Sequence, residues 1–207
     1  MGYRAVIFDL GGVVLESPLH TIARYEREVG LPAGFVNRVV AGGGPSGAWS
    51  RLERGELAME EFYSAFEADC ERAGGHIDAR GLFERIAEQS VPRPAMIEAI
   101  RRIREHGLSA GALTNNWSSE RDGTGVLRPH FDAFIESCVV GMRKPDPRIY
   151  DLVCQALRVA PSEAVFLDDI GANLKPARAL GMETIKVEEP LAALDALQRL
   201  LEIPLLA

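Results

Sequence analysis

The stretch YRAVIFDLGGVV, residues 3–14, decides the fold predicted for this chain. Its first part, Tyr3–Phe8, is mostly apolar and rich in strand-forming residues, which indicates a buried parallel strand. Asp9 follows directly, and Gly11 and Gly12 allow the backbone to approach a ligand closely. Because open α/β sheets bind ligands at the carboxyl ends of their strands, Asp9 is a candidate functional residue. Taken alone, an aspartate at this position more often caps the following turn.

Short apolar runs alternate with helical patterns in the second half of the chain. Strands are predicted at residues 108–113, 134–139, 164–167 and 183–187, and helices at residues 94–106, 147–157 and 174–180. Alternation of this kind indicates βαβ units. The predicted fold class is therefore α/β, with a mainly parallel sheet.

The segment between the first strand and residue 92 has a different composition. It contains helical patterns, at residues 20–29, 59–72 and 79–88, and no run typical of a strand. Glycines and a proline predict a loop at residues 41–47. We therefore expect a core formed by residues 1–16 and 92–207, and a helical cap, residues 17–91, that covers Asp9 as a lid.

Composition and charge restrict the class of partner. The 207 residues are 47% hydrophobic and carry a formal charge of −7, as in a soluble globular protein whose main partner is neither nucleic acid nor an anionic membrane. A small anionic substrate remains possible, because a bound cation and a lysine can make a site locally positive. With no membrane-spanning run and no leader-like N-terminus, a cytoplasmic location is expected. The cysteines fit neither a disulfide framework nor a zinc site and are expected to be buried thiols: Cys70, Cys138 and Cys154.

Two acids, Asp168 and Asp169, follow another predicted strand and come just before a helix. Adjacent carboxylates repel each other and are costly to gather near Asp9 unless a cation lies among them. That requirement indicates Mg²⁺, with Asp9 attacking phosphorus to form an aspartyl-phosphate that water then hydrolyses. Capping of the following helix by Asp169 would explain one of the two acids but not both.

Polar residues at the ends of two other segments complete a set suited to phosphoryl transfer. Thr114 and Asn115 end the 108–113 strand with donors for phosphate oxygens, although Thr114 could equally cap a helix. Lys144 precedes Pro145, which fixes it on a stiff turn where it could pair with the nucleophile and the phosphoryl group. The alternative for Lys144 is a solvated surface lysine, and Arg143 fits that alternative better.

These motifs together resemble the haloacid-dehalogenase-like (HAD) hydrolase superfamily over nearly the whole chain. Residues 8–13, residues 113–115, Lys144 with Pro145, and Asp168-Asp169 with Asn173 are similar to its four motifs in order. Residues 141–150 and 166–178 also resemble the HAD domains joined to soluble epoxide hydrolase and to some acyl-CoA dehydrogenases. The resemblance implies a Rossmann-like parallel sheet with an inserted helical cap. It also implies catalysis by Asp9 and Lys144, with Mg²⁺ held by Asp9, Asp168, Asp169 and the backbone carbonyl of Gly11.

Gly11 departs from the pattern of that family. Typical phosphatases of the superfamily carry there a second aspartate, which gives a proton to the leaving group and then takes one from water. Such acid–base help is worth about 10²–10⁴ in rate, so good leaving groups such as acyl phosphates and sugar-1-phosphates become better candidates. Glu16 and His20, just after the first motif, are possible replacement donors, although a solvated glutamate and a helix-start histidine are the more common roles.

Three functions are compatible with this sequence. The first is a Mg²⁺-dependent phosphatase acting on a small phosphorylated substrate, as a monomer or homodimer. The second is a non-catalytic HAD domain used for binding or assembly, which Gly11 favours and the otherwise complete set of motifs opposes. The third is a metal-independent haloacid dehalogenase, in which the Asp168-Asp169 pair would have no evident role.

Overall fold

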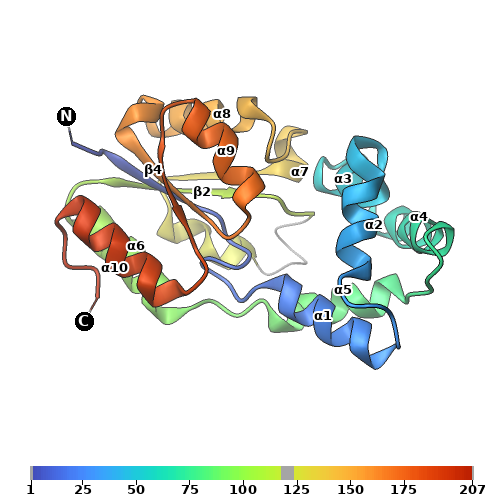
Figure 1. Cartoon of the computed structure of the whole chain (residues 1–207). Coiled ribbons are helices and arrows are strands. Elements are labelled where there is room, and N and C mark those ends of the chain that lie inside the picture. The colour runs from blue at the N-terminus through green and yellow to red at the C-terminus, as the bar shows by residue number, and fades with distance from the viewer. Residues whose placement is uncertain (1, 118–123, 207) are drawn as a thin grey trace.

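The computed structural model describes residues 2–117 and 124–206 and contains one five-stranded parallel sheet (Figure 1). The strand order is β3-β2-β1-β4-β5. The central strand pairs with two neighbours, so that Val6 lies opposite Ala110 on one side and Val165 on the other. The predicted α/β class is confirmed by strands with these bounds: β1 (Ala5–Phe8), β2 (Ser109–Thr114), β3 (Ala133–Glu136), β4 (Ala164–Asp168) and β5 (Glu183–Lys186).

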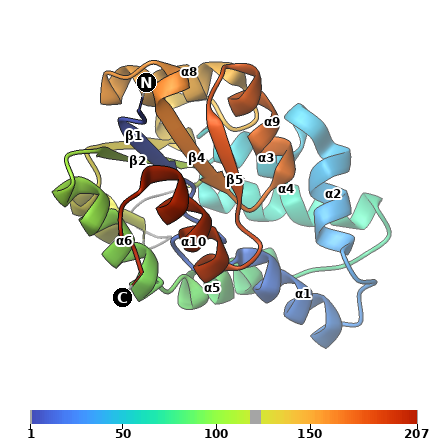
Figure 2. The same ribbon diagram turned by 60° about the vertical axis from the view of Figure 1, so that its left-hand side comes forward.

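Helices cover both faces of the sheet. On one face lie α6 (Pro94–Glu105) and α10 (Pro190–Leu201), and on the other lie α8 (Pro147–Leu157) and α9 (Gly171–Ala179) (Figures 1 and 2). Alternate residues of β1 face opposite sides, since Val6 belongs to the first apolar cluster and Ile7 to the second. A strand buried on both faces explains why the first apolar run shows no polar alternation.

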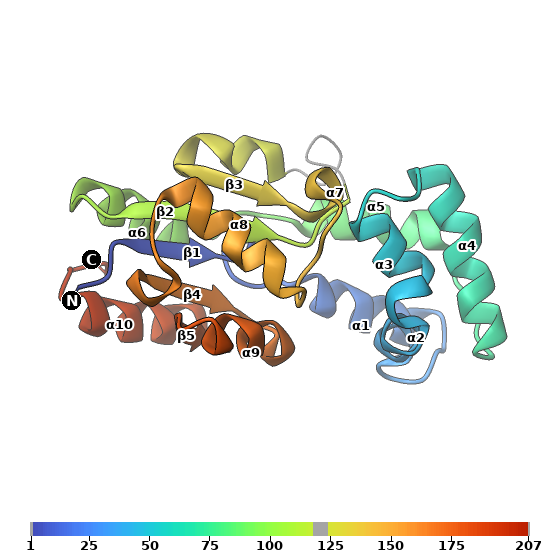
Figure 3. The same ribbon diagram turned by 90° about the horizontal axis from the view of Figure 1, so that it is seen from above.

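A separate group of helices lies beyond the carboxyl ends of the strands (Figure 3). Its members share an apolar cluster rich in aromatic rings, in which Phe83 lies 4.8 Å from Phe62 between ring centroids. The division into a core, residues 1–16 and 92–207, and a cap, residues 17–91, stays a prediction, and the two words are used below for those residues. The helices of the cap are α1 (Pro18–Glu28), α2 (Phe35–Gly43), η1 (Gly44–Ser46), α3 (Ala48–Glu53), α4 (Met59–Arg72) and α5 (Ala79–Gln89).

Two sequence predictions were wrong in part. The strand predicted at residues 134–139 ends at Glu136, because the chain turns into α7 (Ser137–Val140), where the Ser137 hydroxyl accepts from the backbone N–H of Asn116 at 2.9 Å. The loop predicted at residues 41–47 is mostly helical, because α2 continues to Gly43, with Phe35 and Val36 buried in the cap, and η1 follows directly; only Gly47 lies outside a helix. The remaining short helices are η2 (Thr124–His130) and η3 (Pro161–Glu163).

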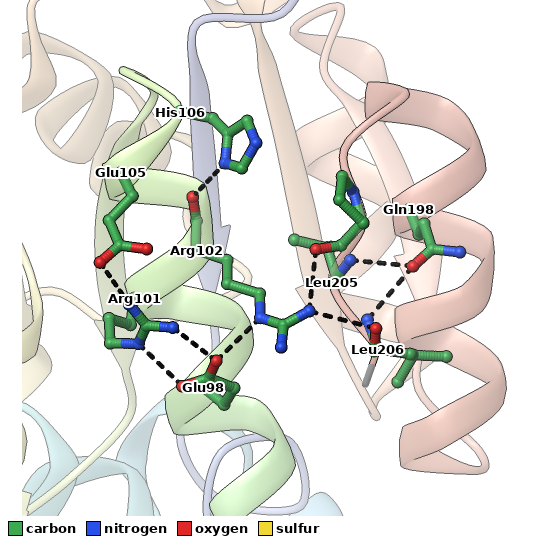
Figure 4. A network of polar contacts seen from close by, with 9 residues as sticks. Glu98, Arg101, Arg102, Glu105, His106, Gln198, Leu205 and Leu206 are labelled. Atoms are coloured by element: carbon green, nitrogen blue, oxygen red, sulfur yellow. Dashed lines mark hydrogen bonds and ion pairs between the residues drawn. The ribbon is translucent and has the colours of Figure 1, made fainter.

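The C-terminal segment is fastened to α6 at the end of the molecule away from the cap (Figures 1 and 4). Arg102 donates to the carbonyls of Pro204 at 3.2 Å and Leu206 at 3.1 Å, and Gln198 accepts from the N–H of Leu205 at 2.8 Å. These bonds hold an irregular segment over the apolar cluster beneath it. None of the helices among the described residues has the length and apolar character required to cross a membrane.

Candidate functional site

Three charged side chains from separate segments meet at the carboxyl edge of the sheet. The Nζ atom of Lys144 lies 2.8 Å from Oδ1 of Asp9 and 2.7 Å from Oδ2 of Asp168. Asp9 follows β1 and Asp168 ends β4, the strand beside it, so the sheet itself brings the two acids together. All three side chains are buried. Lys144 is therefore not the solvated surface lysine that was weighed as its alternative.

Asp168 is held by further hydrogen bonds. Its carboxylate accepts from Nδ2 of Asn173 at 3.1 Å and from the backbone N–H of Ile170 at 2.7 Å. The backbone carbonyl of Asn173 in turn accepts from the hydroxyl of Tyr150 at 2.7 Å. Asn173 therefore orients Asp168. Tyr150 gave no signal in the sequence beyond an apolar helix position.

Asp169 differs from Asp168 because one of its oxygen atoms has no partner. Among the described residues, Oδ1 of Asp169 is buried and accepts no hydrogen bond. Burial, together with the charge of Asp168, raises the pKa of Asp169 to about 6. Gly12 leaves room for this carboxylate, since a Cβ at Gly12 would lie 2.2 Å from Oδ2 of Asp169.

The site carries more negative than positive charge. One oxygen each from Asp9, Asp168 and Asp169 lies within 4.8 Å of the other two, and the ammonium of Lys144 contacts only two of these acids. Burial and the two neighbouring acids raise the pKa of Asp9. Burial alone would lower the pKa of Lys144, but Asp168 and Asp9 outweigh it and raise that pKa. A further cation among these oxygens would relieve the repulsion.

Asn115 and Thr114 lie where the sequence predicted them, at the end of β2. The amide of Asn115 makes a pair of bonds to the backbone of Lys144, accepting from its N–H at 2.8 Å and donating to its carbonyl at 3.0 Å. The side chain of Asn115 therefore fixes the backbone of Lys144. Thr114 is buried and borders a small hollow together with Gly11.

A cavity of about 300 Å³ lies between the charged residues and the cap. Asp9, Lys144 and Asp169 line its core side. Its other wall is mostly apolar and is formed by Leu19, Ile22, Val36, Val40, Trp49 and Trp117. A hollow of about 480 Å³ on the cap contains none of the predicted site residues. The cavity of about 300 Å³ therefore suits a ligand with one polar end and one apolar end.

Two charged residues of this cavity, Arg143 and Glu53, were not predicted from the sequence to lie at the site. Arg143, expected at the solvated surface, pairs with Glu53 of the cap at 2.5 Å between Nε and Oε2. Glu53 was not singled out in the sequence, because its partner lies in a distant part of the chain. Burial raises the pKa of Glu53, and the charge of Arg143 opposes that shift.

Neither of the two possible replacement donors lines the cavity that contains Asp9. Glu16 pairs with Arg93 at 3.0 Å, and this bond lowers its pKa, which makes Glu16 a poor proton donor. His20 is exposed and borders a hollow that does not include Asp9. Neither contact favours a role in proton transfer.

Comparison with protein families agrees with this geometry. A model described as haloacid dehalogenase-like hydrolase matches residues 3–181, most of the chain. The chain belongs to the haloacid dehalogenase-like hydrolase family. It is therefore a HAD hydrolase, as the four motifs implied.

Curated relatives support the same assignment. The chain is 42% identical to mouse acyl-CoA dehydrogenase family member 10, over 98% of this chain and 20% of that protein. It is 38% identical to bifunctional epoxide hydrolase 2 of Sus scrofa, over 100% of this chain and 40% of that protein. The chain thus spans well under half the length of these two relatives. Other HAD relatives are named phosphatases.

Solved structures share the fold. A HAD family enzyme of Bacteroides thetaiotaomicron, in complex with magnesium and inorganic phosphate, superposes with a TM-score of 0.63 at 19% identity. The match covers 89% of this chain and 94% of that one. Identity at this level supports the fold alone.

Proposed function

We propose that this HAD hydrolase is a Mg²⁺-dependent phosphatase that cleaves a small phosphate monoester through an aspartyl-phosphate on Asp9. One observation carries the proposal. Asp9, Asp168 and Asp169 each place a carboxylate oxygen within 4.8 Å of the others, beside the buried ammonium of Lys144. Such a concentration of acids is unfavourable unless a cation shares the site, and that cation would also bind an oxygen of a phosphoryl group.

Each residue has a role in the proposed reaction. A carboxylate oxygen of Asp9 attacks phosphorus in line, forming a P–O bond while the bond to the leaving oxygen breaks. Lys144 holds Asp9 in place and offers positive charge to the phosphoryl oxygens. Water then attacks the aspartyl-phosphate, which releases phosphate and restores Asp9. Thr114 and the backbone of Asn115 are proposed to bind phosphoryl oxygens at the end of β2.

The acids of the site fit a magnesium ion. Mg²⁺ prefers oxygen ligands, and the unpaired Oδ1 of Asp169 is such an oxygen in a buried position. Asp9, Asp169 and the carbonyl of Gly11 are proposed to hold the ion, whose charge would stabilise the phosphoryl oxygens. Asp168 is committed to Lys144 and Asn173, so we propose that it supports the site from behind. The Bacteroides thetaiotaomicron enzyme forms a complex with magnesium and phosphate, so the shared fold is compatible with this ion.

The cavity favours a substrate with an apolar organic part. Its cap side presents mainly aliphatic and indole side chains to the space in front of Asp9. Burial of apolar substrate surface there is worth about 25 cal/mol per Å². With Gly11 in place of an acid, we propose that good leaving groups react fastest.

The proposal includes a cytoplasmic location. Burial raises the pKa of the Cys70 thiol to about 12 and that of Cys154 to about 11. Buried, unreactive thiols are compatible with a reducing compartment.

A phosphatase panel tests the proposal. Aryl, acyl and alkyl phosphates are incubated with wild type, in Mg²⁺ and in excess chelator, and phosphate release is measured. We expect phosphate release in the presence of Mg²⁺ and none in excess chelator. Full turnover in chelator would indicate metal-independent chemistry, and no turnover of any phosphate would favour the non-catalytic HAD domain.

A further inference from the structure

Arg143 contacts the cap, and Lys144, which follows it in the sequence, contacts the buried acids. While Lys144 faces the acids of the core, the guanidinium of Arg143 reaches α3 of the cap. There it pairs with Glu53 at 2.5 Å and donates from Nη1 to the hydroxyl of Ser50 at 2.9 Å. Glu53 and Ser50 lie one turn apart on α3, so a single helix face contacts Nε and Nη1 of the guanidinium.

The partners of Arg143 are both buried, unlike the residues of an ordinary surface ion pair. Glu53 is 6% exposed and Ser50 is 1% exposed. Removing a carboxylate from water is costly, and a single ion pair does not reliably offset that cost. Stability alone therefore does not explain why the Arg143–Glu53 pair is buried. Its position beside the catalytic centre offers another explanation.

Glu53 is itself fixed by the aromatic cluster of the cap. Its Oε1 accepts from the indole Nε1 of Trp49 at 3.0 Å. The ring of Trp49 packs against Phe66 at 5.3 Å and Phe83 at 5.1 Å between centroids. A carboxylate held in this way has little freedom, so it presents a fixed negative charge to Arg143.

On the core side, the backbone of Lys144 is held equally firmly by the two bonds from Asn115. The backbone of residues 143 and 144 is thus anchored from opposite sides, by the cap through Arg143 and by β2 through Asn115. The side chain of Lys144 starts from this anchored segment and ends between Asp9 and Asp168. A shift of the segment would carry Nζ away from both acids.

We propose that Glu53 is a positioning residue, which acts through Arg143 to place Lys144 between Asp9 and Asp168. The inference rests on the proposed function for its effect on rate, but the placement of Lys144 is a structural statement that needs no turnover. It also gives the cap a part in assembling the charged site, in addition to its apolar wall.

The test is a double-mutant cycle with Glu53→Gln, Arg143→Gln and the double variant, with kcat and KM measured for one aryl phosphate. Glu53→Gln keeps the shape of the side chain and its bond to Trp49 but removes the charge. We expect kcat to fall about 10–100-fold in each single variant, with KM changed by less than about threefold, since misplacement near 1 Å costs on the order of 10²-fold. The double variant should be no worse than the poorer single variant, because both act along one path. Glu53→Asp should restore part of the rate.

Glu56→Gln is the matched control, because Glu56 is an exposed glutamate that pairs with Arg54 just after α3. It should leave kcat unchanged. If Glu53→Gln fails to fold, the Arg143→Gln variant gives the same test from the other side of the pair, because the side chain of Arg143 is 26% exposed and tolerates substitution better.

Crystal structures of the variants decide the proposal independently of activity. Displacement of Nζ of Lys144 from Asp9 or Asp168 is the expected result. Lys144 in its wild-type position in both single variants would overturn the proposal, whatever happens to the rate. Additive losses in kcat would also overturn it, whereas an inactive wild type would contradict only the proposed function.

Discussion

Two groups of charged side chains in this protein pair a basic residue with acids at different depths. At the carboxyl edge of the sheet, Lys144 is 1% exposed and lies between two buried aspartates. On α6, at the other end of the core, the side chains of Arg101 and Glu98 are 51% and 39% exposed (Figure 4). Both groups have close ion pairs, so the distances between charges do not distinguish them.

The difference lies in what each group costs. Exposed pairs gain little, because water screens them and long side chains lose freedom, so the pairs of the α6 group add little to the stability of the fold. Burying several acids around one lysine costs free energy of folding. A protein tolerates that cost where the charges serve binding or catalysis, so substitutions in the buried group should affect activity and substitutions in the exposed group should not.

Asp9→Asn should have the largest effect. An amide cannot act as the nucleophile, so phosphate release should fall by at least about 10³-fold while the fold is kept. Steady-state phosphate release in Mg²⁺ and a circular dichroism spectrum provide the measurement. Asp195→Asn on α10, the same change where the side chain is 45% exposed, is the control and should retain full activity. Substantial release by the Asp9 variant would remove the basis of the account.

Removal of the metal should have the second-largest effect on activity. Excess chelator should silence the wild type, and added Mg²⁺ should restore it. Asp169→Asn should raise the Mg²⁺ concentration for half-maximal rate by about 10²-fold, because a neutral amide binds Mg²⁺ more weakly than a carboxylate whose Oδ1 has no hydrogen-bond partner among the described residues. Titration of the rate with Mg²⁺ measures this shift. An identical titration curve for wild type and variant would rule out Asp169 as a ligand.

The absence of an acid at Gly11 should have an effect of intermediate size on kcat. The size of that effect should depend on the leaving group of the substrate. Without an acid at this position, kcat should fall as the pKa of the leaving group rises, so aryl and acyl phosphates should outrun alkyl phosphates. A Cβ at residue 11 would meet only Pro18 at 3.5 Å, so Gly11→Asp fits the backbone. That variant should speed alkyl phosphates about tenfold or more. A flat dependence in wild type would mean that another group already donates the proton.

Arg102→Ala should have the smallest effect. Its bonds to the C-terminal segment are partly exposed, so the free energy of unfolding should fall by no more than about 1 kcal/mol, with activity unchanged. Urea denaturation followed by fluorescence measures the loss. A fall of several kcal/mol, or a change in kcat, would show that depth is a poor guide to importance here.

Much of this contrast could be predicted from the sequence, because the sheet links distant positions by a simple rule. Asp9, Thr114 and Asp168 each come at or next to the end of an apolar run, and parallel strands bring such ends together. Pairing across the sheet therefore follows once the strands are recognised. The four motifs also gave the correct family.

Other parts could not be read in this way. Glu53 and Arg143 meet only because the cap packs against the core, and neither shows a periodic pattern that announces the other. The amide of Asn115 could have served a phosphate or the backbone, and only the folded position of Lys144 decides between them. The end of β3 was misjudged because apolar residues continue into α7, where strand and helix cannot be told apart by composition.

The stereochemical course at phosphorus tests the central claim most directly. A thiophosphate monoester made chiral with oxygen isotopes is hydrolysed in labelled water with Mg²⁺, and the configuration of the released thiophosphate is determined. Each in-line displacement inverts phosphorus, so attack by Asp9 followed by attack of water predicts overall retention. Inversion would show that water attacks the substrate directly, which would contradict the role of Asp9 as nucleophile.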